Sequence, residues 1–148
     1  MTSCVCVMPF AVQEPFDERG RSPAVQYYEQ ARRLMENGDT EQAVGLFQKS
    51  AVESPHFKTY ELLGECLRRL KRFTEAIPYL AAAAILNRGV RAPSLLAEAW
   101  LALGRHGDAL EAATAALLRD PMNKGALKIR KIVESRSELG QGPNPISE

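Results

Sequence analysis

The sequence contains few of the residues that cross-link a protein, bind metals or give it a strong charge. Its 148 residues include three cysteines and two histidines, and the formal net charge is only +1. Three cysteines form neither an even disulfide framework nor paired CxxC motifs, and Cys4 with Cys6 cannot by themselves complete a tetrahedral zinc site. A charge near zero provides no field that would recruit nucleic acid or an anionic membrane. We therefore expect no metal, no cofactor, no nucleic-acid partner and no membrane partner.

Long apolar runs are also missing. No stretch approaches the ~20 residues that a membrane-spanning helix needs. The first residues, MTSCVCVMPFAVQEPF, have no positively charged start and no long apolar core, so they do not resemble an export signal. Together with the low cysteine content, these absences predict a reducing, cytoplasmic location.

The common catalytic motifs are absent as well. The sequence has no HExxH, no Walker A loop, no GxGxxG after a strand and no GxSxG. His56 and His106 fall in a loop and a turn between apolar segments, where we expect no catalytic role. The enzymatic alternative is confined to the thiols of Cys4 and Cys6, and an activity that survived their replacement by Ser would remove it. We predict that the protein is not an enzyme.

What the sequence does contain is an internal repeat. The same residue types recur every 33 residues, and a period of this size is typical of stacked helical repeats. The recurring positions are Ala43, Ala76 and Ala109; Ala31, Gly64 and Ala97; and Leu34, Leu67 and Trp100.

Each repeat is predicted to be an antiparallel helical hairpin. Two apolar-periodic segments of about 14 residues, each about 21 Å long as a helix, flank a short turn in every repeat. The turns are NGDT at 37–40, LKRF at 70–73 and LGRH at 103–106. Gly38 and Gly104 suit the left-handed residue that ends a helix, and Asp39 with Gln42 is predicted to form a capping box. Small residues at the 31 and 43 positions predict that the paired helices approach closely, and a large residue there would wedge the hairpin open.

The pattern resembles three tandem tetratricopeptide repeats. The residues that carry the resemblance are Tyr27, Ala31, Leu34, Gly38, Asp39, Ala43, Phe47 and Pro55 in the first unit; Tyr60, Leu63, Gly64, Leu67, Ala76, Leu80 and Ala83 in the second; and Leu96, Ala97, Trp100, Gly104, Ala109, Ala116 and Pro121 in the third. Two departures are the period, one residue below the family's usual 34, and Pro93, which stands where an aromatic residue or Leu is common. The resemblance implies an all-α fold, a right-handed superhelix of three helical hairpins and a capping helix.

The sequence pattern predicts that the chain divides into three parts. Residues 1–22 and 139–148 are expected to be flexible ends, and a repeat domain is expected over 23–138. Its repeats span about 24–56, 57–89 and 90–122, and a capping helix covers 123–138 with a polar outer face. Ser22-Pro23 marks the start of the first helix. Whether apolar residues of the terminal helices, such as Ile129 and Val133, mediate self-association stays open at this stage.

A candidate binding face follows from helix geometry, with 100° per residue and the core line of the first helix at 27, 31 and 34. The resemblance implies that this face of the stacked first helices lines a concave groove. The candidate groove residues are Tyr28, Arg32, Met35, Lys58, Glu61, Glu65, Arg68, Arg91, Glu98, Leu101, Lys124 and Lys131.

The charge of this face allows two interpretations. With Arg69 and Glu134 added, it has seven basic and four acidic residues, a surplus of three positive charges. The functional interpretation is recognition of an extended or helical peptide of acidic character. The alternative is a solvated helix face on which Glu pairs with Lys or Arg.

A more specific relation within the family is not expected. Relatives that hold the carboxylates of a heat-shock chaperone's C-terminus use Lys, Asn and Arg at positions that correspond here to Tyr28, Arg32, Leu62, Arg91 and Leu95. Only two of these are basic, so a two-carboxylate clamp is not predicted. We expect a non-catalytic adaptor, monomeric or weakly dimeric, that binds another protein. The alternative is a small three-repeat chaperone that sequesters a secretion or assembly client.

Overall fold

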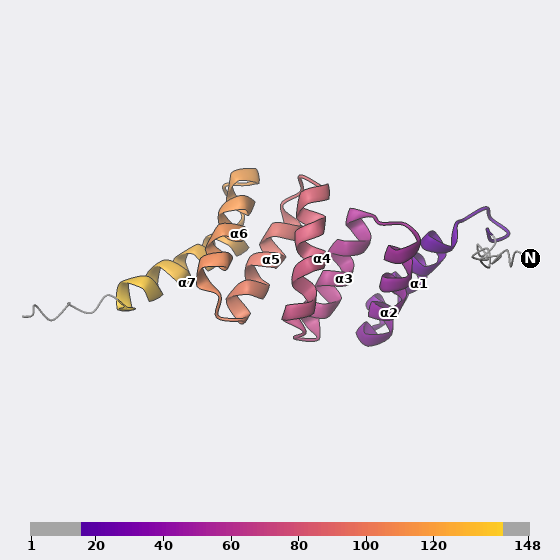
Figure 1. The fold of residues 1–148 in the computed structure, drawn as a ribbon, viewed down its shortest axis with the longest axis horizontal. Coiled ribbons are helices and arrows are strands. Elements are labelled where there is room, and N and C mark those ends of the chain that lie inside the picture. Colours follow the sequence, from indigo (N-terminus) through magenta and orange to yellow (C-terminus); the bar gives the residue numbers. More distant parts are fainter. Residues whose placement is uncertain (1–15, 141–148) are drawn as a thin grey trace, which may run out of the picture.

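The computed structural model describes residues 16–140 and folds them into seven helices with no strand in that range. The helices are α1 (Pro23–Asn37), α2 (Thr40–Glu53), α3 (Phe57–Arg69), α4 (Phe73–Leu86), α5 (Arg91–Ala102), α6 (His106–Arg119) and α7 (Lys124–Gly140). They follow one another along the long axis of the molecule (Figure 1). The predicted all-α repeat fold is confirmed.

Each helix packs mainly on its neighbours in sequence. The most extensive contacts join α1 to α2, α3 to α4 and α5 to α6, which are the three predicted hairpins. Further contacts join α2 to α3, α4 to α5 and α6 to α7, so each hairpin stacks on the next. The first helices also meet one another, because α3 contacts α5 and α5 contacts α7. Stability in such a stack is the sum of the repeats and the interfaces between them.

The first helix of every repeat ends in the same way. A residue with positive φ follows it: Gly38 at 91°, Lys71 at 59° and Gly104 at 73°. The next backbone N–H then donates back over the helix end, from Asp39 to Leu34, from Arg72 to Leu67 and from Arg105 to Trp100, at 2.9, 2.8 and 3.0 Å. The predicted turns are therefore confirmed. In the middle repeat a lysine adopts the conformation that glycine adopts in the other two.

The starts of the helices only partly follow the prediction. Pro23 is the first residue of α1, as the Ser22-Pro23 signal indicated. The capping box at Asp39 is wrong, because its side chain makes no cap hydrogen bond to the start of α2. Asp39 directly follows the left-handed Gly38 and has φ −78° and ψ 57°, far from the extended backbone that lets a side chain fold over the first turn.

The small residues of the repeat allow the helices of each hairpin to approach closely. Ala31, Ala43, Ala76, Ala97 and Ala109 are all fully buried. The closest approach is at Gly64, where a methyl group would lie 2.5 Å from Cγ of Leu80. A larger side chain at this position requires Leu80 to shift or α3 and α4 to move apart.

The core consists of two clusters of different composition. The cluster of the first four helices also reaches α5 and contains Phe47, Leu63, Leu67 and Leu80 among its buried side chains. Cys66 belongs to it as a small hydrophobic residue, and burial raises the pKa of its thiol to about 11. The cluster of the last three helices is built mainly from alanine: Ala97, Ala109, Ala112, Ala113, Ala116 and Ala126, with Ile129 and Val133.

The last helix covers the end of the stack. Ile129 and Val133 are 3% and 7% exposed and pack against the alanine-rich cluster. They are therefore not an exposed apolar face, which removes them as candidates for self-association. The reason is the 3.6-residue period, which places both on the face of α7 that meets α6.

Candidate functional site

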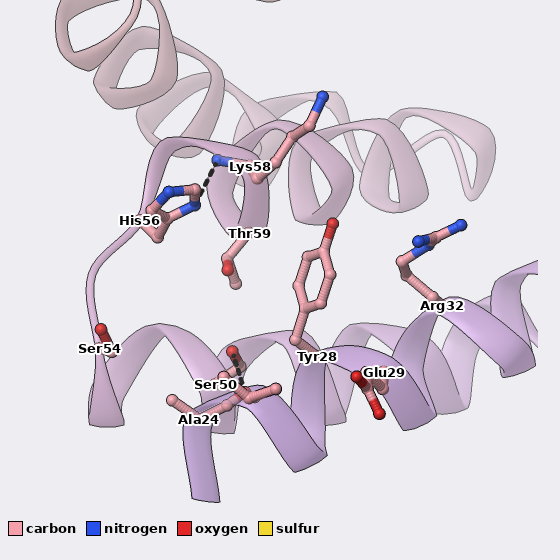
Figure 2. Close-up of a pocket in the computed structure, with 10 residues that line it drawn as sticks. Ala24, Tyr28, Glu29, Arg32, Ser50, Ser54, His56, Lys58 and Thr59 are labelled. Carbon is pink, nitrogen blue, oxygen red and sulfur yellow. Dashed lines mark hydrogen bonds between the residues drawn. The ribbon is translucent and has the colours of Figure 1, made fainter. Parts of the chain in front are cut away.

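A cavity of about 470 Å³ opens between the first helices of repeats one and two. It is lined by Ala24, Val25, Tyr28, Glu29 and Arg32 of α1, Ser50 of α2, Lys58 and Thr59 of α3, and the connecting residues Ser54 and His56. Apolar atoms form most of its inner surface, and charged groups lie at its rim (Figure 2). This volume falls within the range of small-ligand pockets.

Tyr28 is held in place by the core below it. Its ring meets the buried ring of Phe47 edge to face, with the centroids 5.9 Å apart. In Figure 2 the phenol stands between the side chains of Lys58 and Arg32. The structure thus brings three of the predicted groove residues, from two different helices, to one cavity.

The wall beside α2 is fixed by a buried hydrogen bond. The Ser50 hydroxyl donates to the carbonyl oxygen of Ala24 over 2.8 Å, which ties the end of α2 to the start of α1. Thr59 is buried on the opposite side. At the connection, the backbone N–H of Lys58 donates to Nδ1 of His56 over 3.2 Å, so His56 caps α3.

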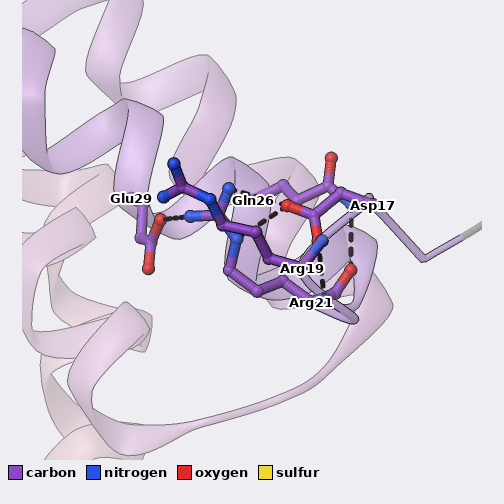
Figure 3. A network of polar contacts seen from close by, with 5 residues as sticks. All are labelled: Asp17, Arg19, Arg21, Gln26 and Glu29. Atoms are coloured by element: carbon purple, nitrogen blue, oxygen red, sulfur yellow. Dashed lines mark hydrogen bonds and ion pairs between the residues drawn. The ribbon is translucent and has the colours of Figure 1, made fainter.

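A polar cluster next to α1 neutralises the one acid of the cavity wall (Figure 3). The Arg21 guanidinium bridges Glu29 and Asp17, with 2.7 Å between Nη2 of Arg21 and Oδ2 of Asp17. The backbone N–H of Arg21, together with its side chain and the N–H of Arg19, lowers the pKa of the Asp17 carboxyl.

The two cations at the rim of the cavity, Lys58 and Arg32, have fewer carboxylate partners than Arg21. Lys58 has no carboxylate within ion-pair distance among residues 16–140, and Arg32 pairs only with the exposed Glu36, at 3.1 Å. Exposed pairs of this kind contribute little free energy and exchange readily. The rim can therefore supply two cationic groups to an incoming anion.

A second cavity continues the groove toward repeat three. It has a volume of about 370 Å³ and is lined by Arg32, Met35, Glu36, Leu62, Arg69 and Arg91. Arg32 lines both cavities. The two hollows therefore adjoin on the face of the first helices.

Two predicted groove residues lie beneath this surface. The side chains of Glu61 and Glu65 are only 6% and 7% exposed. Arg91 reaches both carboxylates, at 3.6 Å from Glu61, and Arg69 pairs with Glu65. The prediction that these two acids face solvent on the groove is wrong, because α5 packs against α3 and brings Arg91 over them. A buried carboxylate needs such partners, since its unpaired charge would be costly.

The predicted surplus of positive charge is correspondingly reduced. Arg91 and Arg69 neutralise the buried acids, and Arg68 pairs with Glu98 at 3.1 Å. Much of the charge on this face thus links neighbouring helices, through the pairs of Arg91 with Glu61 and Glu65 and of Arg68 with Glu98. Within the described range, Lys58 and Arg32 make no ion pair to a neighbouring helix.

The remaining predicted residues lie toward the C-terminal end. Leu101 is half-buried on the alanine-rich cluster, and Lys124 and Lys131 are exposed on α7. None of these three lines either cavity. The structure does not bring them together with Tyr28.

Sequence reasoning missed the residues that line the cavity from outside the first helices. Ser50 comes from a second helix, and His56 from the connection between repeats. A projection of the first helix alone cannot include either of them. The available signal was Ser50 itself, a polar residue at a position where the other two repeats have Ala83 and Ala116.

The described residues offer no group of three or more His, Cys, Asp or Glu side chains that could hold a metal ion. Within the same range, no helix is long and apolar enough to span a bilayer. Cys4 and Cys6 lie outside the described residues.

Comparison with known protein families gives a match over part of the chain. A family model described as tetratricopeptide repeat matches residues 28–94. No curated protein matches the sequence significantly.

Solved structures share the fold. The first tetratricopeptide repeat domain of Spaghetti (RPAP3), bound to the HSP90 peptide SRMEEVD, is 20% identical to this chain. Its TM-score is 0.73, and the match covers 78% of this chain and 94% of that one. The translocator chaperone SycD of type III secretion in Yersinia enterocolitica is 19% identical with a TM-score of 0.71, over 82% and 99%. MamA from Desulfovibrio magneticus RS-1 is 25% identical with a TM-score of 0.73, over 81% and 70%.

Proposed function

We propose that this chain, a tetratricopeptide repeat protein, is a non-catalytic interaction module that binds a segment of a partner protein in the groove of its first helices. The observation that carries the proposal is the pair of adjoining cavities that share Arg32. Two adjoining cavities of about 470 and 370 Å³ accommodate several residues of an extended chain rather than a single side chain.

The residues that line the first cavity indicate which residue types the partner segment contains. Its apolar interior, formed by Ala24, Val25 and the Tyr28 ring, suits an aliphatic or aromatic side chain. Lys58 and Arg32 at the rim suit a carboxylate beside that side chain, either of an acidic residue or of a chain end. The proposed ligand is therefore a short segment with one apolar anchor next to an acid.

The relatives are consistent with this use of the fold. The Spaghetti (RPAP3) domain is bound to a peptide that ends in acidic residues, and SycD is a chaperone. Neither similarity assigns a partner to this chain, because both identities are near 20%.

The test is a selection of random peptides with free C-termini on the purified protein, followed by calorimetry of the selected peptides. Lys58→Glu is expected to weaken binding by about tenfold or more, because a hydrogen bond to a charged group contributes about 1.5–3 kcal/mol. Tyr28→Ala is expected to weaken it as well. Lys128→Glu is the matched control, because Lys128 is an exposed lysine of α7 that lines neither cavity.

Arg91 is not a suitable test residue. Its replacement would remove a partner of the buried Glu61 and Glu65, so lost binding could not be separated from lost stability. Equal effects of Lys58→Glu and Lys128→Glu would contradict the proposal. Binding of long unfolded clients without any short peptide would favour the alternative, a three-repeat chaperone that uses the same groove.

A further inference from the structure

Each repeat exposes an aliphatic side chain at the same place, near the end of its second helix. Val52, Ile85 and Leu118 follow one another at intervals of 33 residues, in α2, α4 and α6. They are 82%, 84% and 82% exposed. A single exposed aliphatic residue is ordinary, but the repeat symmetry aligns these three into one row. We call Val52, Ile85 and Leu118 the outer apolar row.

Neighbouring apolar groups extend the row. Leu86, beside Ile85, is 57% exposed, and Met122, just beyond α6, is 78% exposed. At the C-terminal end, a cavity of about 280 Å³ is lined by Leu118 and by Thr114, Leu117, Pro121, Leu127 and Arg130. This end of the row therefore offers space for a further aliphatic side chain.

The row is separate from the groove. None of its three residues lines either cavity of the groove, which is formed mainly by the first helices. A molecule on the outer apolar row leaves the groove open to its own ligand.

Charged residues adjoin both ends of the row. Glu53 is adjacent to Val52 at one end and enters none of the ion pairs found among residues 16–140. Arg119 is adjacent to Leu118 at the other end. Its guanidinium donates to the carbonyl oxygens of Asn87, Gly89 and Ala84 at 3.0, 2.7 and 2.9 Å, and no carboxylate in the described range pairs with it.

We propose that the outer apolar row is an interface between two copies of this chain, arranged antiparallel about a two-fold axis at Ile85. A second copy presents the same side chains at the same spacing, so all three positions meet at once. Val52 of one copy then lies on Leu118 and its cavity in the other, and Ile85 meets its own equivalent. The antiparallel arrangement also places Glu53 of one copy beside Arg119 of the other.

The interface is small, so the dimer is expected to be weak. A few aliphatic side chains per copy bury less than the ~1,600 Å² of a standard protein interface. We therefore expect self-association with a Kd on the order of micromolar to hundreds of micromolar.

The first test is sedimentation equilibrium of the whole chain across this concentration range. The wild type is expected to dimerise, and Ile85→Glu, which places two carboxylates at the axis, is expected to weaken the dimer about 100-fold or more. The control is Leu139→Glu, because Leu139 is 85% exposed but lies at the end of α7, off the row. Circular dichroism verifies that both variants remain folded.

A wild type that stays monomeric throughout this range would overturn the proposal, and the row would then face another protein or solvent. Equal weakening by Ile85→Glu and Leu139→Glu would overturn it as well. The groove variant Lys58→Glu should leave the dimer unchanged, so failure of the dimer and failure of the proposed function are distinguishable.

Disulfide trapping tests the antiparallel arrangement. In a chain with Cys4→Ser and Cys6→Ser, the remaining Cys66 is fully buried. A mixture of a Val52→Cys chain and a Leu118→Cys chain should form a cross-linked pair under mild oxidation. Either chain alone should cross-link at least about tenfold less, because its cysteines lie at opposite ends of the dimer. Efficient cross-linking of Val52→Cys to itself would contradict the antiparallel arrangement.

Discussion

The two halves of the molecule share one repeat but hold their helices together differently. In the first four helices, Phe47 and three leucines fill the space between hairpins. In the last three, six alanines let the helices approach closely, and Ile129 and Val133 of α7 supply the larger side chains. Each large side chain buries more apolar area and so contributes more free energy. The same repeat geometry therefore yields a strong N-terminal half, which carries the groove, and a weaker C-terminal half that depends on its last helix.

The largest expected effect comes from removing the main side chain of the N-terminal cluster. Phe47→Ala should lower the free energy of unfolding by about 3–5 kcal/mol, because the cavity it leaves is fully enclosed. Chemical denaturation followed by circular dichroism measures the change. Gln42→Ala, at an exposed position of the same helix, is the control and should stay within about 0.5 kcal/mol.

The C-terminal half should respond locally to a change in α7. Ile129→Ala is expected to cost about 2–3 kcal/mol and to increase hydrogen exchange in α6 and α7 while α1–α4 keep their protection. The comparison variant is Leu139→Ala, on the exposed end of the same helix. An equal increase in exchange across all seven helices would show that the two halves unfold as one unit.

Two glycine substitutions compare a tightly packed helix position with an open one. Gly64→Ala should destabilise the chain by about 1–3 kcal/mol, because the new methyl group meets Leu80. Gly45→Ala, in α2, meets no atom within 4 Å and should instead be neutral or slightly stabilising. Thermal melts of the two variants provide the measurement, and shifts of the same sign would be inconsistent with this account.

The smallest effect concerns the turn of the middle repeat. Lys71→Gly should raise the free energy of unfolding by about 0.5–1 kcal/mol, because lysine is strained at a φ of 59°. The reverse change at the equivalent position, Gly38→Lys, should lower it. If both substitutions are neutral, the backbone at position 71 relaxes without cost.

The fold could be predicted because its determinants are local and repeated. The 33-residue spacing, the small residues and the glycine turns each specify a hairpin without reference to distant parts of the chain. The predicted capping box is wrong, and the reason is also local. The left-handed Gly38 directly precedes Asp39 and determines its backbone conformation.

The candidate site was only partly predictable. Helix geometry predicted that Tyr28, Arg32 and Lys58 share one face, because their spacing along each helix fixes the face. All three line one cavity in the structure, and their part in binding stays a prediction. It could not show that Glu61 and Glu65 are buried, since that depends on how closely α5 approaches α3. For the same reason it could not show that Arg91 is engaged within the protein.

The most direct test of the groove is hydrogen–deuterium exchange of the protein with and without a selected peptide. We expect added protection in α1, in α3 and in the connection that contains His56, with little change in α6 and α7. Added protection concentrated at the ends of α2, α4 and α6, or on α7, would contradict it and place the ligand on another face of the repeats.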